Sequence, residues 1–355
     1  MSALLLGLDL GTTSLIARLW DAEGQLLAEA SCDNPQQQYG SDVIARMEAA
    51  MAGKGGELQA LLVAGINELI GQLRRQAGDH VASITKAAAA ANPAIGLLLA
   101  GKSVEKLLRP PYRPDYSAGE ELDCAALGIN MGVPIYLLPL VSGYDGVGLL
   151  AVLLGSPPED GPTLYLDLGT NAELALWDGE DWLVSSVAAG PAFEAGNLSC
   201  GMRHGFGAVN EVGVVKDRFT YTVTGGGMPK GLCGSGLFSL LSRALQAGLI
   251  ASDGRIKSAA EIDSNLARYL AEDDGRPLLQ VYRDARTSLR LTQDDVRAFQ
   301  LAKGAVLAGV NCLLERKGLT PEQLGAVRIA GALGGALPPA ALKGVPMLPE
   351  IVLEK

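Results

Sequence analysis

The sequence has few of the residues that mark several common classes of protein. Aromatic residues make up only 5% of the 355 positions, there are 2 histidines, and the 5 cysteines are scattered along the chain. None of the cysteines forms a C-x-x-C pair, and an odd, unclustered set is typical of reduced thiols in a cytosolic protein. An iron–sulfur module needs four closely spaced thiolates, so we expect no iron–sulfur cluster in this chain.

Long apolar runs and an excess of positive charge are also missing. No apolar stretch reaches the length of a membrane span, and no basic region precedes Leu4 near the N-terminus. We therefore predict a cytoplasmic protein without a membrane partner. The 29 basic residues are outnumbered by 39 acidic ones, and the net charge of −10 argues against a nucleic-acid partner.

Glycine and aliphatic residues are abundant instead. The 45 glycines and a hydrophobic content of 48% are typical of an α/β enzyme in which small residues allow close packing. A chain of this length favours two domains. The segment 157–162, which reads PPEDGP, is the clearest linker, so we expect one domain over residues 1–156 and another over 157–355.

One phrase occurs twice in the sequence. The segment 8–13 reads LDLGTT, and the segment 166–171 reads LDLGTN. Each copy ends an apolar run and is followed by a second apolar run and then by an acidic turn, at 21–24 and at 178–181. The repetition predicts a duplicated strand–turn–strand–turn–strand unit, two similar half-domains, and one ligand held between the two turns.

Each copy contains groups that suit phosphate binding. Gly11 and Gly169 let the chain reverse tightly, which brings backbone N–H groups close to an anion. The hydroxyl groups of Thr12, Thr13 and Thr170 add donors at phosphate distance. A single copy is more often an ordinary β-turn capped by its own aspartate. Two copies in matching contexts favour the phosphate interpretation.

An aspartate precedes each turn, Asp9 in the first copy and Asp167 in the second. A carboxylate cannot bind phosphate alone because like charges repel, but a hard cation between the two removes the conflict. Mg²⁺ keeps most of its waters and is usually held by one or two carboxylates together with phosphate oxygens. We therefore predict that Asp9 and Asp167 hold hydrated Mg²⁺, and that one of them orients the attacking water or acceptor.

Three further glycine loops are candidates for function. Glu194 is the one acidic residue of the loop 190–197, and it is either a general base or water-positioning group, or a solvent-facing carboxylate at a helix start. The loop 231–236 opens a helix, so it either binds a phosphate or docking carboxylate or serves tight packing. The small residues of 331–335 allow a purine ring to lie against the backbone.

The remaining apolar pattern predicts alternating strands and helices. Apolar residues at helical spacing predict an amphipathic helix over 57–76. Further helices are expected over residues 42–51, 93–99, 146–154, 237–247 and 294–316. Strands are expected over residues 3–8, 15–20, 25–31, 80–88, 133–140 and 327–330, and in three runs between 164 and 187. The proline-rich segment 109–114 is expected to be an extended loop.

Together, these motifs resemble the actin-like ATPase superfamily, which includes acetate and sugar kinases. The resemblance implies an α/β fold of two ribonuclease-H-like domains with mixed β-sheets flanked by helices, with two phosphate loops and an adenosine loop. The residues that match these three loops are, in order, Asp9, Gly11, Thr12 and Thr13; Asp167, Gly169, Thr170 and Asn171; and Gly331, Gly334 and Gly335.

Within that superfamily, the sequence is similar to the ATP-dependent reductive activators of corrinoid proteins. The similar segments are 34–36, 39–44, 189–194, 197–202, 233–236 and 300–305. The similarity implies an ATPase, with ATP and Mg²⁺ as cofactors, that drives the uphill reduction of a corrinoid protein from Co(II) to Co(I). A homodimer fits the family, and a separate donor such as a ferredoxin would supply the electrons.

The sequence departs from this family in three places. The family usually carries an N-terminal ferredoxin domain, whereas this chain begins at the first ATPase strand, so we expect a separate ferredoxin, a truncated chain or a divergent member. Residues 91–95 read ANPAI where the family tends to have GNTTM, which removes hydroxyl donors from that loop. The chain also stops at Lys355, where the family suggests a further closing helix.

Three other functions stay open at this point. An activator of a 2-hydroxyacyl-CoA dehydratase carries a cluster through two cysteines per subunit, and Cys200 and Cys233 each precede a glycine, although we interpret both as buried thiols. A small-molecule kinase would use Asp167 or Glu194 as a base. A non-enzymatic scaffold would have lost turnover, and the intact Asp9 and Asp167 argue against that.

Overall fold

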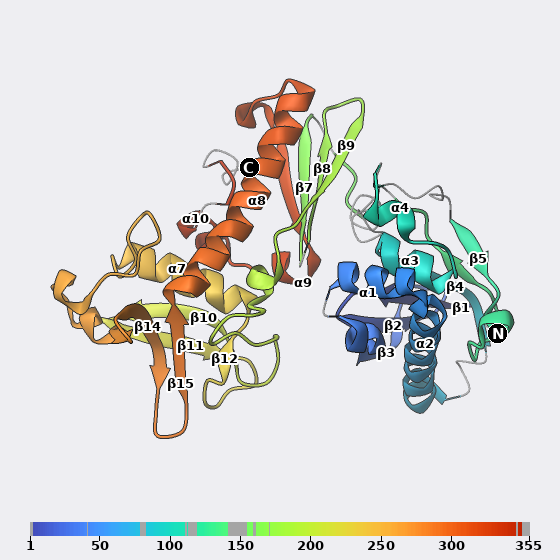
Figure 1. Ribbon diagram of the computed structural model, residues 1–355, viewed down its shortest axis with the longest axis horizontal. Coiled ribbons are helices and arrows are strands. Elements are labelled where there is room, and N and C mark those ends of the chain that lie inside the picture. The colour runs from blue at the N-terminus through green and yellow to red at the C-terminus, as the bar shows by residue number, and fades with distance from the viewer. Residues whose placement is uncertain are drawn as a thin grey trace. The chain divides into compact units, whose positions relative to one another are not determined.

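The computed structural model describes residues 3–40, 42–78, 83–110, 112, 119–140, 155–158, 161–169, 171–345 and 347–349. The chain divides into two compact units, Met1–Gly155 and Ser156–Lys355 (Figure 1). Each unit has its own hydrophobic core, and the two cores share no residue among those that the structure describes. The units are therefore described one at a time.

A six-stranded mixed sheet forms the centre of the first unit, in the order β3-β2-β1-β4-β6-β5. Its strands are β1 (Leu4–Leu10), β2 (Ser14–Trp20), β3 (Leu26–Asp33), β4 (Ile84–Ala91), β5 (Glu120–Leu122) and β6 (Ile135–Leu137). The first three strands form an antiparallel meander, and β4 pairs with β1 in parallel. Every second residue of β1, from Leu4 to Leu10, is buried, as expected for a strand with one face on the core.

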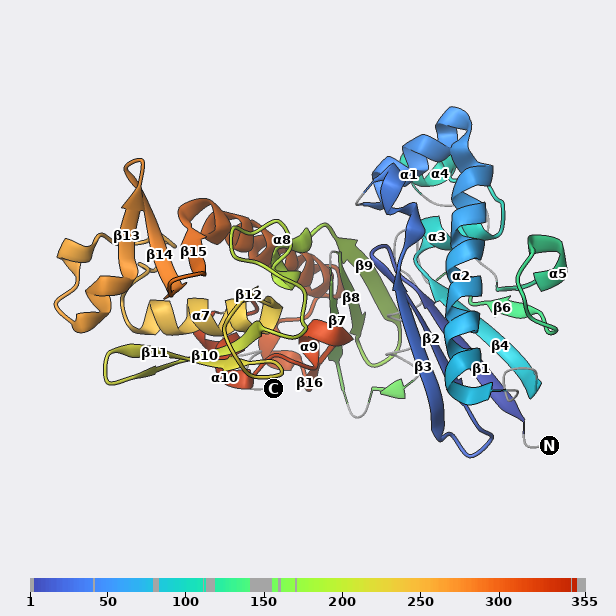
Figure 2. The same ribbon diagram turned by 90° about the horizontal axis from the view of Figure 1, so that it is seen from below.

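Helices pack against this sheet in the first unit. The long α2 (Gly55–Ala77) contacts β2 and β3 and runs across them in Figure 2. Its buried residues recur at helical spacing, as the amphipathic pattern predicts. The other helical segments are η1 (Pro35–Tyr39), α1 (Val43–Ala49), the π-helical η2 (Ala50–Lys54), α3 (Pro93–Leu99), α4 (Glu105–Leu108) and α5 (Cys124–Leu127).

The structure describes three sheets in the second unit, in the orders β16-β7-β8-β9, β11-β10-β12 and β13-β14-β15. The strands are β7 (Thr163–Leu168), β8 (Ala172–Trp177), β9 (Trp182–Val187), β10 (Ala208–Val215), β11 (Arg218–Val223), β12 (Gly231–Leu232), β13 (Leu270–Asp273), β14 (Arg276–Arg283), β15 (Ser288–Thr292) and β16 (Ala326–Ala330). β7, β8 and β9 form an antiparallel meander like β1, β2 and β3, and β16 pairs with β7 in parallel. Both units therefore contain the duplicated strand motif.

The helix α8 (Gln293–Lys317) is the longest element described in the second unit. A capping box of Thr292 and Asp295 begins it, and the left-handed Gly318 ends it. It packs across β8 and β9, and its Gly309 permits the close approach, since a β-carbon there would lie 2.5 Å from Leu174 Cδ1. The other helical segments are η4 (Pro191–Glu194), α7 (Gly234–Gln246), η5 (Ala259–Glu261), η6 (Asn265–Tyr269), η7 (Pro321–Gln323), α9 (Gly331–Gly334) and α10 (Pro339–Gly344).

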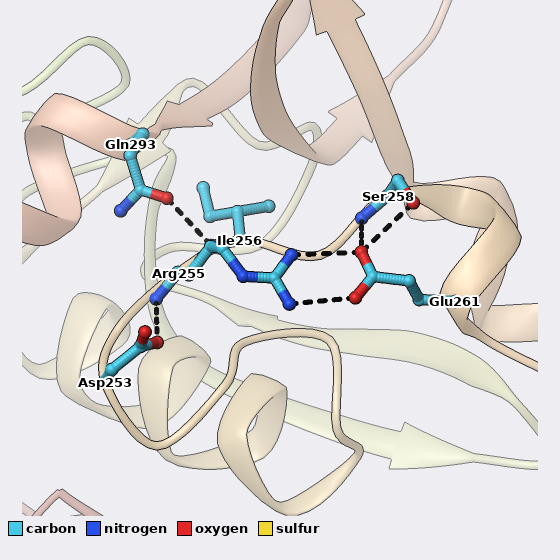
Figure 3. Close-up of polar contacts among 6 residues, drawn as sticks. All are labelled: Asp253, Arg255, Ile256, Ser258, Glu261 and Gln293. Carbon is cyan, nitrogen blue, oxygen red and sulfur yellow. Dashed lines mark hydrogen bonds and ion pairs between the residues drawn. The ribbon is translucent and has the colours of Figure 1, made fainter.

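Hydrogen bonds between charged and polar side chains stabilise the loop between α7 and η5 (Figure 3). The guanidinium of Arg255 donates to both carboxylate oxygens of Glu261, at 3.0 and 2.8 Å. The same carboxylate accepts the Ser258 N–H at 2.8 Å and completes a capping box for η5. Gln293 of α8 accepts the Ile256 N–H at 2.8 Å, which attaches this loop to the start of α8.

Most of the expected elements are confirmed, with small shifts of their ends. The strand expected over 133–140 is wrong in length, because only Ile135–Leu137 pairs with its neighbours. The helix expected after the 231–236 loop begins earlier, at Gly234. The helix expected over 146–154 and half of the loop over 109–114 lie outside the described residues. Among the helices that the structure describes, none is long and apolar enough to cross a membrane.

Candidate functional site

The first of the two repeated turns is the hairpin loop between β1 and β2. Leu10 pairs with Leu15, so residues 11–14 form the loop, and the Gly11 N–H donates to the Ser14 carbonyl at 3.0 Å. A β-carbon at Gly11 would lie 2.8 Å from that carbonyl oxygen. Only glycine therefore fits this position without a shift of the backbone.

Two asparagines hold this first turn in place. Asn34, which is buried, donates from its side chain to the Gly11 carbonyl at 2.8 Å and from its backbone to the Thr13 carbonyl at 2.9 Å. Asn92 donates to the Thr12 hydroxyl oxygen at 3.0 Å. Both asparagines also cap a helix that has proline in its first turn. Their side chains fix the turn, a role that the sequence analysis did not assign.

The carboxyl group of Asp9 lies at the end of β1 next to this turn. Its side chain is on the opposite face of the strand from the buried leucines, and Asp9 pairs with Ile16 of β2. Partial desolvation by the surrounding protein raises the pKa of this carboxyl, and the positive charge of Arg18 opposes the rise. The donor set is one carboxylate beside a turn, which suits a hydrated Mg²⁺ better than a fully caged metal.

The second turn joins β7 to β8 and is one residue shorter than the first. Leu168 pairs with Ala172, and the Gly169 N–H donates to the Asn171 carbonyl at 3.0 Å. Thr170, a predicted phosphate ligand, lies outside the described residues. A β-carbon at Gly169 would lie 3.6 Å from Glu194 Oε1, so the structure places Glu194 beside this turn.

The predicted adenosine loop follows β16 and contacts the aspartate of the second turn. Ala330 is the register partner of Asp167 in the parallel pair of β16 and β7. Gly331 has a φ of 82°, and a β-carbon on it would lie 2.3 Å from Asp167 Oδ1. Residues Gly331–Gly334 form a single helical turn, α9, where the sequence suggested only a glycine turn.

The three glycine loops of the second unit lie side by side. Phe193 of η4 is buried, and a β-carbon at Gly234 would lie 2.2 Å from its carbonyl oxygen and 2.8 Å from Leu333 Cδ1 of α9. The loops 190–197, 231–236 and 331–335 thus meet at one corner, together with the second turn. Tight packing explains why position 234 is a glycine. The side chain of Glu194, at the same corner, is exposed to solvent.

Neither Cys200 nor Cys233 has the surroundings of a cluster ligand. Both are buried, and burial raises the pKa of the Cys200 thiol to about 12. The Cys233 thiol donates to the Val209 carbonyl at 3.3 Å. In the part of the chain that the structure describes, no three or more His, Cys, Asp or Glu side chains gather as a metal cage would require. Both cysteines are therefore buried, as we interpreted them.

Comparison with known proteins identifies the family. Residues 161–355 match the family described as the C-terminal domain of RACo, the ASKHA domain, and residues 4–157 match the RACo middle region. The chain belongs to the RACo family. The ASKHA fold is the actin-like fold, so the predicted fold class is confirmed, and so is the resemblance to reductive activators of corrinoid proteins.

Relatives of the chain carry names that refer to corrinoid proteins. The corrinoid activation enzyme RamQ of Eubacterium limosum is 31% identical, over 97% of this chain and 60% of its own length. A [Co(II) methylated amine-specific corrinoid protein] reductase of Methanosarcina barkeri is 26% identical over 56% of this chain and 37% of its own length. A solved reductive activator for corrinoid, iron–sulfur protein superposes with a TM-score of 0.85 and 28% identity, over 99% of this chain and 58% of its own. The chain thus spans at most about 60% of the length of these RACo-type relatives.

Proposed function

We propose that this chain binds and hydrolyses ATP and couples that reaction to the reductive reactivation of a corrinoid protein from Co(II) to Co(I). A separate donor such as a ferredoxin supplies the electron. The observation that carries the proposal is the corner of the second unit where Gly331 contacts Asp167 and Glu194 lies beside Gly169. This corner occurs in a chain whose two units both match RACo regions.

The residues of this corner have complementary roles in the proposal. The Gly169 turn and Asn171 bind phosphate, Glu194 orients the attacking water, and the small residues at Gly331, Gly334 and Gly335 leave room for the adenosine. Glu194 is suited to its role because its side chain is exposed beside the second turn. It belongs to η4, which the buried side chain of Phe193 attaches to the core.

In the first unit, the rigid turn of Gly11, Thr12 and Thr13 contributes further phosphate donors. Its geometry is fixed in advance by Asn34 and Asn92, which reduces the entropy that ligand binding would otherwise cost. Asp9 and Asp167 hold Mg²⁺ through its waters. When bound, Mg²⁺ would offset the negative charge of the phosphates.

ATP assists the reduction through binding energy rather than through cobalt chemistry. The corrinoid carries the redox chemistry, and the activator supplies contacts that differ between its nucleotide states. A nucleotide can shift a conformational equilibrium only as far as its affinities for the two states differ. We therefore propose that the ATP-bound and ADP-bound chains bind the corrinoid protein with different affinities.

The test is a set of ATPase measurements with and without a Co(II) corrinoid protein. We expect slow hydrolysis by the chain alone and faster hydrolysis with the cognate Co(II) protein. Asp9→Asn and Asp167→Asn should each abolish turnover, whereas Glu180→Gln, an exposed carboxylate on the loop between β8 and β9, should retain it. Wild-type rates in both aspartate variants would contradict the Mg²⁺ assignment. A cognate Co(II) protein that neither binds nor stimulates would contradict the proposed function, and a phosphorylated small molecule formed without it would indicate a kinase.

Protein stability distinguishes loss of function from loss of fold in this experiment. Desolvation raises the pKa of Asp9, so folding makes the charged form of this carboxyl less favourable than it is in the unfolded chain. Removing the charge with Asp9→Asn should therefore leave the melting temperature equal to, or slightly above, that of the wild type. A large fall in melting temperature would show that Asp9 serves the fold instead.

A further inference from the structure

The buried polar and charged residues described in the first unit all lie in one short segment. They are Asn34, Gln36 and Arg46, with exposed fractions of 1%, 0% and 0%. The segment begins at Asn34, whose side chain holds the Gly11 turn, and it ends in α1. A core built mainly from aliphatic side chains therefore has one polar region, and that region starts at the first phosphate turn.

The guanidinium of Arg46 is buried with most of its hydrogen-bonding capacity unused. Its Nε donates to the Gly40 carbonyl at 3.1 Å, whereas Nη1 and Nη2 have no hydrogen-bond partner in the part of the chain that the structure describes. The acidic group whose charge acts on Arg46 is Asp42, but this carboxylate is exposed and accepts the Ala45 N–H at 2.9 Å. A buried charge without a partner is costly, and folded proteins seldom contain one.

The unused edge of this guanidinium suits an oxyanion. Nη1 and Nη2 lie in one plane, so they can donate in parallel to two oxygens of the same phosphate or carboxylate group. Because Nε is bound to Gly40, this edge is the one left for a ligand. Gln36 Oε1 is a second buried atom without a partner among the described residues. A phosphate with its hydration waters offers acceptors to Arg46 and donors to Gln36.

The contacts of α1 relate Arg46 to the first phosphate turn. Gln37 of η1 donates to the Thr13 carbonyl at 2.7 Å, and Arg46 binds the Gly40 carbonyl at the other end of η1. α1 also contacts α3 (Figure 1), the helix whose capping asparagine binds Thr12. α1 therefore packs against both of the segments that fix the turn, and Arg46 is on its buried side.

Glycines flank α1 on both sides. Gly40 has a φ of 150°, and a β-carbon on it would lie 2.4 Å from the Ala45 β-carbon, so only glycine fits there. After α1, Gly53 has a φ of 91° and interrupts the helical angles of the exposed η2. Met47 is the one residue of α1 that is fully buried in the described core. A short helix with one core side chain and one unpaired buried charge is weakly held.

The guanidinium has no exposed surface, so an anion reaches it only when α1 moves. We propose that α1 moves about its flanking glycines when a phosphate group binds at the Gly11 turn, and that Arg46 then pairs with oxygens of that phosphate. The inference rests on the proposed function, because ATP is the ligand that brings phosphate to this turn. The new ion pair favours the moved position of α1 over the closed one, so binding of the nucleotide changes the conformation of the first unit.

The experiment measures nucleotide binding by arginine variants of the full chain. Arg46→Met keeps an unbranched side chain and removes the charge, so the affinity for MgATP should fall about tenfold or more. Arg46→Lys should recover part of this loss, because an ammonium group keeps the charge without the two-pronged geometry. Arg75→Met is the matched control, since Arg75 is exposed near the end of α2 and its loss should leave the affinity unchanged.

Thermal unfolding and hydrogen exchange separate ligand binding from a role in the fold. Without ligand, Arg46→Met should melt at or above the wild-type temperature, because an apolar side chain replaces an unpaired buried charge. A clear fall in this melting temperature would show that Arg46 stabilises the fold and would overturn the proposal. ATP should change hydrogen exchange over residues 43–49 in the wild type and leave it unchanged in Arg46→Met. Equal changes in both proteins would count against the movement of α1.

The outcomes also separate this inference from the proposed function. If the wild-type chain binds ATP and Arg46→Met binds it equally well, the role of Arg46 is wrong and the proposed function stands. If the wild-type chain does not bind ATP, the proposed function is overturned, and inorganic phosphate then tests Arg46 by itself. A rise in melting temperature with phosphate that occurs in the wild type and not in Arg46→Met supports the anion site. No rise in either protein overturns it.

Discussion

At the residue scale, the strongest constraint on the candidate site is the contact between Gly331 and Asp167. Parallel pairing of β16 with β7 places the end of one strand beside the aspartate of the other. The chain must then turn away at once, and the positive φ of Gly331 makes that turn possible. The sequence shows a glycine at this position but not its neighbour, because the pairing joins residues more than 160 positions apart in the chain.

Replacing Gly331 tests this contact. We expect Gly331→Ala to lower the free energy of unfolding by about 1–3 kcal/mol, because alanine is strained at this φ and its β-carbon would meet the Asp167 carboxylate. Nucleotide affinity should fall as well. Gly335→Ala is the matched control for stability alone, since Gly335 has helical angles and its β-carbon would lie 3.6 Å from the nearest atom. Urea denaturation and nucleotide titration measure both effects, and equal stability of the two variants would contradict the contact.

At the element scale, the loop after α7 depends on one charged carboxylate. Hydrogen bonds from Arg255 and then from the Ser258 N–H lower the pKa of Glu261 from 4.5 to about 2. Because the pKa of Glu261 is lower in the folded state than in the unfolded state, the charged carboxylate stabilises the fold at pH values above the unfolded pKa. This stabilisation is lost as the pH falls through the folded value. The pH range over which this stabilisation is lost therefore runs from about pH 5 down to about pH 2.

The variant Glu261→Gln should be less stable than the wild type at pH 7, and the difference should shrink from pH 5 to pH 2. Arg255→Gln removes the guanidinium that binds Glu261, and its stability difference from the wild type should shrink over the same pH range. Denaturant midpoints measured across this range at constant salt provide the test. A stability difference that stays constant from pH 5 to pH 2 would show that the hydrogen bonds, rather than the charge, account for it.

The elements that the sequence predicts well are those with a strong apolar period. The helix α2 and the strand β1 repeat buried residues at regular spacing, and β7 is an apolar run that is almost entirely buried. The hairpin of β10 and β11 and the meander of β13, β14 and β15 were not predicted, because polar and charged residues interrupt their apolar runs. The turn between β10 and β11 gave no sequence signal either: Lys216 and Asp217 both have positive φ, a conformation that glycine or asparagine more often supplies in a two-residue hairpin turn.

The candidate site was predicted in its parts but not in its assembly. The doubled turn, Glu194 and the late glycine loop all follow from residue type and spacing. The contacts among the loops at 190–197, 231–236 and 331–335 depend on close packing of glycine against backbone, which no local pattern records. The roles of Asn34 and Asn92 were missed too, although each stands before a proline at the start of a helix.

At the scale of the whole molecule, the chain is two folding units with separate cores. The core of the first unit is built from β1, β2, β4, α2 and α3, and the core of the second from β7, β8, α7 and α8. Each unit also matches its own region of the RACo family. The proposed function would need parts that keep their internal structure while their relation to a partner changes.

Separate cores predict separate unfolding transitions in the absence of nucleotide. Leu69 and Phe299 are almost fully buried, one in each core, and truncating each to alanine should cost about 2–5 kcal/mol. For units of this size, each variant should lower one calorimetric transition by roughly 5–15 °C and leave the other in place. Leu301→Ala is the control, because Leu301 is 77% exposed and should move neither transition. A single transition that falls equally in both core variants would show that the units unfold as one cooperative body. In that case, nucleotide binding would have to act by a local change around Glu194.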